Sequence, residues 1–466
     1  MNKNLFYSLL VFYALMILCY SLNSGLTCTN DGSHFALVNS ILERGSFELD
    51  DNLRFAKHDS AVFAGKHYSD RPPGLSFFLC MFNTAVSPVK GFLKMINFDD
   101  FAFLRTDYVE DLRITLFQLF PAFCCAALFA VIYFLLLKMS YKPNVSLIVA
   151  LGFCCGTILL RYGTLLYSHI FTALLVTCSY SLAVLYSRNR SLTVLCLSTF
   201  LIAYAVITEY MSVLLLVPLF VFYAFKCRKE FFTIKHFSGF IISGMVPAVI
   251  LMAYNYKNFG NPLSIAQFHH STYVFYQDPG SIFFGTSFLS NAKVLLFYSP
   301  KYTTLFGGSI YLCSIFLLPF TLHALKRKPG AELLLFLSGF LITAAGVFSY
   351  TLCTGGLDLN YRHMLFGVPL LAPLVAETFS SVEALGERHG NDSAYRIYVI
   401  VFLGAVLYSF ILQVRHVRTF FQSQRESLFC NLDAAFNNCS WFMVLLILYI
   451  FIIISFAVSV RRERSA

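Results

Sequence analysis

Long apolar stretches alternate with short polar segments along the 466 residues of the chain. A helix needs about 20 apolar residues to cross the hydrocarbon core of a bilayer, and about twelve stretches approach or exceed that length. The pattern therefore predicts an all-α integral membrane protein with about twelve transmembrane helices. The expected spans cover residues 5–25, 112–138, 144–162, 168–187, 191–208, 210–226, 237–256, 303–325, 331–352, 363–382, 396–413 and 441–460.

Basic residues gather in short segments that follow apolar stretches. Short loops rich in Lys and Arg stay in the cytoplasm, so we expect these segments and both termini on the cytoplasmic side. The long connection of residues 26–111 is then extracytoplasmic, as are residues 257–302, 353–362 and 414–440. The basic clusters are Lys138/Lys142, Arg188/Arg190, Lys226/Arg228/Lys229/Lys235, Lys326/Arg327/Lys328 and Arg461/Arg462/Arg464.

The composition agrees with a membrane protein, because 58% of the residues are hydrophobic and only 12% are charged. A soluble domain of this length would need far more charge on its surface. The net charge of +10 is explained by the cytoplasmic clusters, and no basic helix or aromatic platform indicates nucleic acid as a partner. We interpret residues 1–466 as one polytopic membrane domain, with residues 26–111 as its first extracytoplasmic loop.

Two further features concern processing and redox chemistry. The first apolar run, from Leu5 to Leu22, is followed by no small-residue cleavage site and is expected to be an uncleaved span. Most of the fourteen cysteines lie inside apolar stretches, where Cys behaves as a small hydrophobic residue. Cys430 and Cys439 lie in an expected outer loop, and the sequence leaves open whether they form a disulfide.

The first outer loop opens with TNDGSHFALVNSILERG. Thr29, Asn30 and Asp31 have the chemistry of a helix start, and the apolar positions after them predict a helix along the membrane surface that ends at Gly45. Asp31 then has two interpretations. It caps this helix, or it is a carboxylate at the lip of a cavity that takes a proton from an attacking hydroxyl.

A polar segment follows in the same loop, with the sequence FAGKHYSDRPPGLSFF. Arg71 precedes two prolines, which push its backbone into an extended conformation and stiffen the chain before an apolar interfacial helix. Lys66, His67 and Tyr68 lie close to Arg71 in sequence. These groups suit a phosphate, because Arg offers a bidentate fork and Lys a point charge. The alternative interpretation is an ordinary solvated turn.

Together these segments resemble the GT-C membrane glycosyltransferases. The resemblance rests on an acid just after the first span, a surface helix, and the motif Tyr-x-Asp-Lys/Arg-Pro-Pro-Gly, here residues 68–74. More narrowly, these segments resemble the branch of protein O-mannosyltransferases and lipid A aminoarabinose transferases (glycosyltransferase family 39). The resemblance covers roughly residues 28–80. Many members carry two adjacent acids where this chain has Asn30-Asp31. No metal ligand is therefore assigned, and a divalent metal cofactor stays open.

Later outer segments resemble the same group. NFGNPLSIAQFHH and LLFYSPKYTTLFGG are similar to its Phe-Gly-x-Pro and Leu-Phe-x-x-Pro patterns, and Lys301 follows the second proline. In GGLDLNYRHMLFGVPLL, Arg362 would face the outer cavity or anchor the span at the headgroups. Glu209 would line the donor groove or simply form a tight outer turn. Three histidines lack any metal-binding spacing: His169, His269 and His270.

The resemblance implies an inverting transfer of a sugar from a polyprenyl-phosphate donor to an extracytoplasmic lipid, glycan or protein. Asp31 would deprotonate the acceptor hydroxyl, and basic side chains would stabilise the leaving lipid phosphate. The expected location is a bacterial inner membrane, with the site on the periplasmic face. The phosphate-binding candidates are Arg71, Lys66, Lys301 and Arg362. The supporting candidates are Tyr68, Asp70, His67 and Glu209, with Asp70 orienting Arg71 or Tyr68.

Two other classes of membrane protein predict different sequence features. A twelve-span secondary transporter predicts two similar six-span halves and ionisable residues at the midplane, and the sequence has neither. A lipid-linked sugar flippase would need no carboxylate at Asp31. The sugar, the acceptor and the oligomeric state are left open by the sequence.

Overall fold

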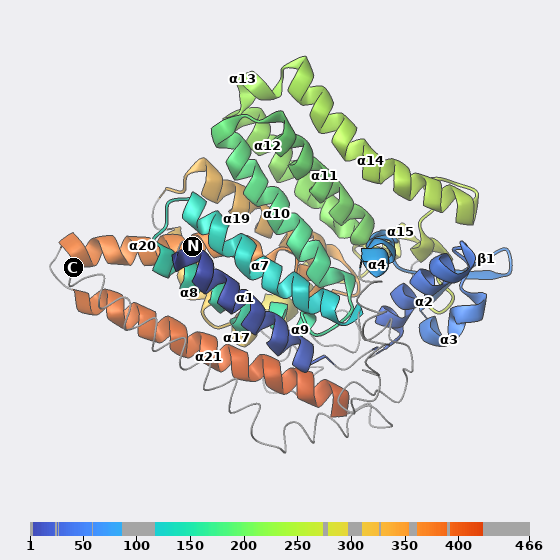
Figure 1. Ribbon diagram of the computed structural model, residues 1–466, viewed down its shortest axis with the longest axis horizontal. Coiled ribbons are helices and arrows are strands. Elements are labelled where there is room, and N and C mark those ends of the chain that lie inside the picture. Colours follow the sequence, from blue (N-terminus) through green and yellow to red (C-terminus); the bar gives the residue numbers. More distant parts are fainter. Residues whose placement is uncertain are drawn as a thin grey trace.

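The computed structural model describes residues 3–23, 26, 28–57, 59–85, 117–273, 278–296, 310–325, 328–353, 361–388 and 392–422. Nearly all of these residues are helical or lie in connections between helices (Figure 1). In these described parts of the chain, five helices are long and apolar enough to cross a membrane, and further apolar helices are shorter. The prediction of an all-α, multi-pass membrane protein is therefore confirmed. The number of about twelve spans stays a prediction, and the last of them (441–460) lies outside the described residues.

The long helices form one bundle around a continuous apolar core. The main helices are α1 (Lys3–Ser21), α7 (Leu119–Lys138), α8 (Pro143–Gly156), α10 (Ser168–Asn189), α11 (Leu192–Thr208), α12 (Leu216–Lys226), α14 (Ile234–Phe259), α18 (Leu317–Ala324), α19 (Ala331–Ser349), α20 (Ala372–Arg388) and α21 (Asp392–Gln422). Shorter helices in the connections are α9 (Ile158–Tyr162), α13 (Arg228–Phe231), α15 (Pro279–Ile282), α16 (Phe288–Leu296) and α17 (Ile310–Cys313).

Several expected spans are interrupted rather than continuous. The span expected at 144–162 divides at Thr157, whose backbone is extended and whose hydroxyl accepts from the Leu159 N–H to start α9. The span expected at 210–226 begins as a 3₁₀ turn, Tyr210–Leu215, and the one expected at 363–382 begins with η8 (Arg362–Met364) and η9 (Val368–Leu371). Hydropathy does not distinguish these tighter turns from α-helix, so the sequence did not predict them.

The basic connections meet at one end of the bundle. Arg188 donates to the Lys138 carbonyl and forms an ion pair with Glu332 at 3.1 Å, and Arg190 donates to the Lys226 carbonyl at 3.3 Å. The elements of the first loop lie at the opposite end of the helices, which we call the first-loop end (Figure 1). Among the residues that the structure describes, the connections that contain Lys138, Arg188/Arg190 and Lys226 therefore share one side of the molecule.

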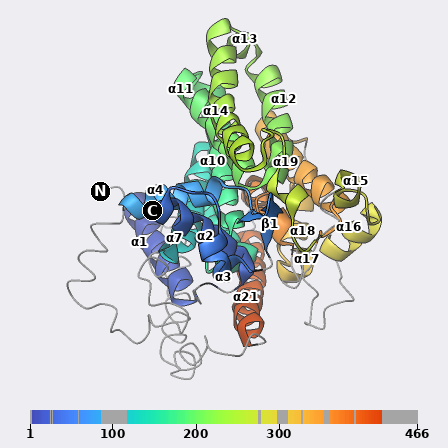
Figure 2. The ribbon, with the colours of Figure 1, turned by 90° about the vertical axis from the view of Figure 1, so that its right-hand side faces the viewer.

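Figure 2 looks onto the first-loop end, where a helix and a small hairpin lie over the bundle. The helix α2 ends at Gly45, whose left-handed backbone (φ 62°) donates to the Ile41 carbonyl, as expected. The hairpin was not predicted. Its loop, Ala64–Gly65, has φ of 49° and 77°, which is the geometry of a two-residue type I′ turn. The first-loop elements are α2 (Thr29–Arg44), η1 (Asp50–Asn52), α3 (Leu53–Ala56), β1 (Ser60–Phe63), β2 (Lys66–Ser69) and α4 (Gly74–Ala85).

Gly74 lets α4 begin directly against the end of α11. The Tyr204 hydroxyl donates to the Gly74 carbonyl at 2.9 Å, and a Cβ at Gly74 would lie 2.7 Å from the Ile207 carbonyl oxygen. Because that neighbour is backbone, Gly74→Ala should push α4 away and cost about 1–3 kcal/mol of stability. Thermal unfolding of the purified protein in detergent measures this. Gly404→Ala in α21 is the control, since nothing lies within 4 Å of its Cβ position. Equal melting temperatures for the two variants would contradict the packing argument.

Candidate active site

Asp31 is buried in the first turn of α2. Its Oδ1 atom accepts from the Cys28 backbone N–H at 3.0 Å, which completes a capping box at the start of the helix. The Cys28 sulfur lies 2.7 Å from the Tyr167 hydroxyl, so this capping turn contacts the connection before α10. The capping contact is therefore present, and the role of Asp31 as a base stays a prediction.

The hairpin brings two acids and Arg71 together. In its register Ser60 pairs with Ser69, so the residues just outside the pair, Asp59 and Asp70, lie side by side. Arg71 Nη2 contacts Asp59 Oδ2 at 2.8 Å, and Arg71 Nε contacts Asp70 Oδ2 at 3.1 Å. Both carboxylates thus hold one guanidinium group, and the side chain of Arg71 is only 23% exposed.

The start of α2 supports this ion cluster. Thr29 donates to Asp59 Oδ2 at 2.9 Å, and Ser33 donates to Asp70 Oδ1 at 3.0 Å. These two hydroxyls flank Asp31 in sequence. They lie on one face of the first helical turn, whereas the carboxylate of Asp31 is on the other face. The structure therefore brings Asp31 and Arg71 to the same end of one helix.

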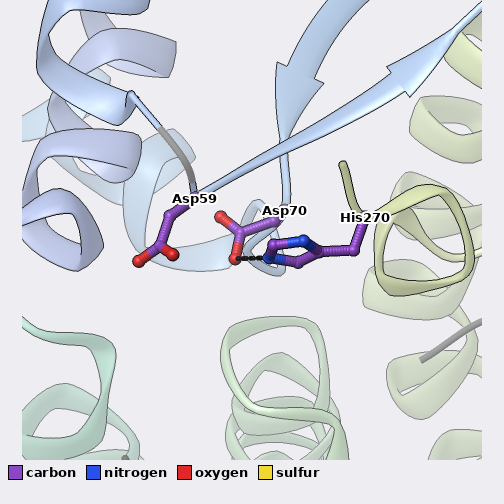
Figure 3. Close-up of side chains that lie close together, drawn as sticks. All are labelled: Asp59, Asp70 and His270. Carbon is purple, nitrogen blue, oxygen red and sulfur yellow. Dashed lines mark ion pairs between the residues drawn. The ribbon is translucent and has the colours of Figure 1, made fainter. Parts of the chain in front are cut away.

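A third group joins the cluster from residue 270. Figure 3 shows Asp59, Asp70 and His270 with their polar groups turned toward one another, and the dashed line marks Asp70 with His270. The His270 Nε2 atom lies 3.6 Å from Asp70 Oδ2. One ligand atom from each of the three residues lies within 4.8 Å of the others, which is a spacing that a metal ion can use.

The surroundings of Asp70 favour its charged form. Burial alone would raise the pKa of this carboxyl, but the Arg71 guanidinium, with His270 and the Ser33 hydroxyl, outweighs burial and lowers the pKa below its ordinary value. Asp70 therefore carries a negative charge next to Arg71. That charge fixes the position of the guanidinium.

Other residues of the polar segment face away from the cluster. Lys66 is next to the hairpin turn, paired with Glu48 and 52% exposed, and His67 pairs with Asp50 at 2.8 Å. Lys66 is three residues from Ser69, or about 10 Å along the strand. The structure thus does not bring Lys66 or His67 beside Arg71. Tyr68 is buried and its ring packs on Phe259 with centroids 5.5 Å apart, which anchors the hairpin to the end of α14.

A second polar group surrounds Glu209, which forms the expected tight turn between α11 and the following 3₁₀ helix. Its carboxylate accepts from Ser168 and lies 2.9 Å from His169 Nδ1. The His169 ring contacts the His363 ring with centroids 5.5 Å apart. Glu209 therefore organises the start of α10 and the segment that contains Arg362 and His363.

The two later basic candidates are placed differently. The Arg362 guanidinium lies 6.0 Å from the centre of the Tyr167 ring, the same tyrosine that contacts the capping turn of α2. Arg362 is thus on the Asp31 side of the site. Lys301 lies outside the described residues, and its role stays a prediction.

Sequence reasoning missed Asp59 and His270 as members of the site. Asp59 is eleven positions before Asp70, and only the hairpin register brings the two together. The dipeptide Ala64-Gly65 was the available signal for the hairpin, because a two-residue turn at this place pairs the segments on either side of it. For His270 the chain offers no local signal, since its neighbours in the site are distant in sequence.

His34 lies in α2 beneath the cluster and is fully buried. Its Nδ1 atom is 3.3 Å from the Ser76 hydroxyl. Burial, together with the nearby charge of Arg71, lowers the pKa of His34 to about 3. The imidazole is therefore neutral in the folded protein, whereas an unfolded chain binds a proton near pH 6.5.

This difference predicts a dependence of stability on pH. Between pH 6.5 and about 3 the unfolded state holds a proton that the folded state lacks, so stability falls as the pH is lowered, by up to about 1.4 kcal/mol per unit. His34→Asn keeps a polar group near Ser76 and removes the titration. Melting temperatures from pH 7 to 4 should fall less steeply for the variant, and parallel curves would contradict the argument.

Comparison with known proteins rests on structure. No protein-family model matches the sequence, and no curated protein matches it either. The crystal structure of ArnT from Cupriavidus metallidurans bound to undecaprenyl phosphate superposes with a TM-score of 0.52 over 89% of this chain and 75% of that one, at 9% identity. The chain has a GT-C fold. At this identity the similarity concerns the fold alone.

The archaeal oligosaccharyltransferase AglB from Archaeoglobus fulgidus, in complex with an inhibitory peptide and a dolichol-phosphate, has the same GT-C fold. Its TM-score is 0.51 at 12% identity, over 90% of this chain and 56% of that one. The chain therefore spans little more than half the length of AglB. Within the GT-C fold, Asp31 and the ion cluster of Arg71 with Asp59 and Asp70 both lie at the first-loop end of the helices.

Proposed function

We propose that the protein is an integral membrane glycosyltransferase that moves a sugar from a polyprenyl-phosphate donor to an extracytoplasmic acceptor, with inversion at the anomeric carbon. The observation that carries the proposal is the linkage through α2. Thr29 and Ser33 donate to the two carboxylates that hold Arg71, and Asp31 lies between them in the same helical turn. One helix start thus connects a candidate base to a candidate phosphate-binding group.

The GT-C fold supports this proposal. The structures of ArnT and AglB contain undecaprenyl phosphate and a dolichol-phosphate, respectively. A lipid with a long polyprenyl tail and a phosphate headgroup suits a bundle of apolar helices with a basic side chain at one end. The donor proposed here is therefore a sugar linked to such a lipid phosphate.

In the proposed reaction, Asp31 takes the proton from an acceptor hydroxyl while the hydroxyl oxygen bonds to the anomeric carbon. The bond between that carbon and the phosphate oxygen breaks, and the electron pair leaves with the lipid phosphate. Arg71 stabilises the charge that develops on this phosphate. Fixed donors aimed at developing charge are generally the largest contribution to catalysis. Arg362, on the Asp31 side of the site, would contact the sugar or its phosphate.

An inverting displacement requires the base and the leaving group on opposite sides of the sugar. Asp31 is on one face of the first turn of α2, and the hydroxyls that donate to the carboxylates holding Arg71 are on the other face. Side chains in a helix tilt toward its N-terminus, so the carboxylate of Asp31 can reach the space beyond that end. Asp70 is engaged with Arg71 and Ser33, so we assign it the role of holding the guanidinium and assign the role of base to Asp31.

A direct assay tests the class of activity. Purified protein in nanodiscs is incubated with undecaprenyl-phosphate sugars, labelled in the sugar, and with membrane extract as the source of acceptor. We expect the label to leave the lipid phosphate and to appear in the acceptor fraction. If the label stays on the donor and the donor instead crosses the bilayer of proteoliposomes, the protein is a flippase and the proposal is wrong.

A further inference from the structure

The group of Asp59, Asp70 and His270 has the spacing of a metal site, so its chemistry decides whether a cation fits. A divalent cation needs lone pairs from its ligands and a place between them. Both requirements can be tested on the contacts of the three side chains.

Arg71 already provides the positive charge that the two carboxylates face. Its guanidinium contacts Asp59 Oδ2 at 2.8 Å and Asp70 Oδ2 at 3.1 Å. A metal ion bound to these two oxygen atoms would have to displace the guanidinium. It would also have to compete with Thr29 and Ser33, whose hydroxyls donate to the same carboxylates.

The hydrogen bonds of His270 exclude it as a metal ligand through Nε2. The backbone N–H groups of Thr272 and Tyr273 both donate to His270 Nδ1, each at 3.1 Å. Nδ1 therefore accepts and carries no proton, so the proton of the neutral ring is on Nε2. An Nε2 atom that bears a proton has no lone pair for a metal, but it is a donor aimed at Asp70, 3.6 Å away.

The position of His270 is itself fixed by the hairpin. The Ser271 N–H donates to the Ser60 carbonyl at 3.0 Å, and His270 forms an antiparallel bridge with Ala61. The segment of His270 thus lies alongside β1, joined to it by an isolated β-bridge. Any movement of this segment is transmitted to Asp70, which contacts Arg71.

We propose that Asp59, Asp70 and His270 hold Arg71 in the orientation that binds the lipid phosphate, and that this binding needs no metal ion. His270 is a positioning residue, since it acts on the phosphate only through Asp70 and Arg71. Arg71 takes the place that a divalent cation would have. The inference rests on the proposed function, because it assigns the phosphate of the donor to Arg71.

Two substitutions of His270 separate positioning from mere packing. In His270→Gln the side-chain amide reaches the place of Nε2 and keeps a donor toward Asp70, whereas in His270→Asn the shorter amide reaches only the place of Nδ1. The probe is undecaprenyl phosphate, titrated into each purified variant and followed by native mass spectrometry. We expect His270→Gln to bind within about twofold of the original protein. His270→Asn should bind about 10-fold more weakly or worse.

His269→Asn is the matched control. This neighbouring histidine stacks on Phe259 and contacts Ser264 rather than the cluster. Its variant should bind undecaprenyl phosphate normally. Equal weakening of all three histidine variants, or full binding by His270→Asn, would overturn the positioning role.

Chelation tests the second half of the inference. The same titration is repeated after treatment with EDTA and again with added Mn²⁺, and the metal content of the purified protein is measured by elemental mass spectrometry. We expect unchanged binding in all conditions. Loss of binding with EDTA, together with bound metal that disappears in His270→Asn, would overturn the inference that phosphate binding needs no metal ion.

Arg71→Ala separates a failure of the proposed function from a failure of the role of His270. Normal lipid binding by this variant refutes the proposed phosphate role, whereas lost binding with normal His270→Asn refutes only the role of His270.

Discussion

Replacing Arg71 with alanine is expected to lower the rate of sugar transfer by about 10²- to 10³-fold, the usual cost of removing one donor aimed at developing charge. The guanidinium is held by Asp59 and Asp70, so it is already oriented before the donor binds. The transfer assay with a labelled undecaprenyl-phosphate sugar measures the effect. Arg71→Lys should recover only part of the rate, because an ammonium group cannot contact both carboxylates and a phosphate in the planar geometry of arginine.

Loss of Arg71 also leaves two buried carboxylates without their counter-charge, which by itself destabilises a protein. The double variant Arg71→Ala/Asp59→Asn removes one of these charges and should regain stability without regaining activity. Arg54→Ala is the control in the same loop, since Arg54 is exposed over the Phe55 ring. If the double variant transfers sugar at the original rate, Arg71 does not act on the phosphate.

Asp31→Asn should reduce transfer by about 10²- to 10⁴-fold, the range for loss of a general base. Asparagine keeps a carbonyl oxygen at the place of Oδ1, so it can still accept from the Cys28 N–H and cap α2. It cannot take a proton from a hydroxyl. The substitution therefore separates the two interpretations of Asp31, and the assay needs only rates and melting temperatures of the two proteins.

Asp31→Ala provides the comparison, because it removes both the base and the cap. We expect a lower melting temperature for alanine than for asparagine, and similar loss of transfer for both. A fully active Asp31→Asn protein of normal stability would show that Asp31 is only a helix cap. The base would then have to be sought elsewhere at the first-loop end.

The larger features of the fold could be predicted because they depend on local chemistry. The start of α2 near Asp31 and its end at Gly45 follow from capping preferences, and α4 begins at the glycine after the two prolines. The hairpin was missed because each strand has only four residues and is partly polar. Likewise, the 3₁₀ turns at the starts of spans are as apolar as helix.

The site was predictable only in part, for a related reason. Arg71 and Asp31 stand in local motifs that the resemblance to GT-C enzymes made visible. Asp59 and His270 join them through strand pairing, which is a long-range property that no short motif encodes. Lys66 shows the converse, because proximity in sequence to Arg71 does not place a residue beside Arg71 when the chain is extended, and its role stays a prediction.

The bond between Ser271 and Ser60 joins positions 211 residues apart. A ribosome adds about 5–20 residues per second, so the hairpin of a nascent chain waits about 10–40 s for the segment that pairs with β1. During that interval Asp70 lacks the neighbour that completes its surroundings. The cluster is thus completed only after residue 270 has been added, well after the hairpin itself has been synthesised. A chain truncated before residue 270 would still contain the sequence motif around Arg71, but it would lack the contact of His270 with Asp70.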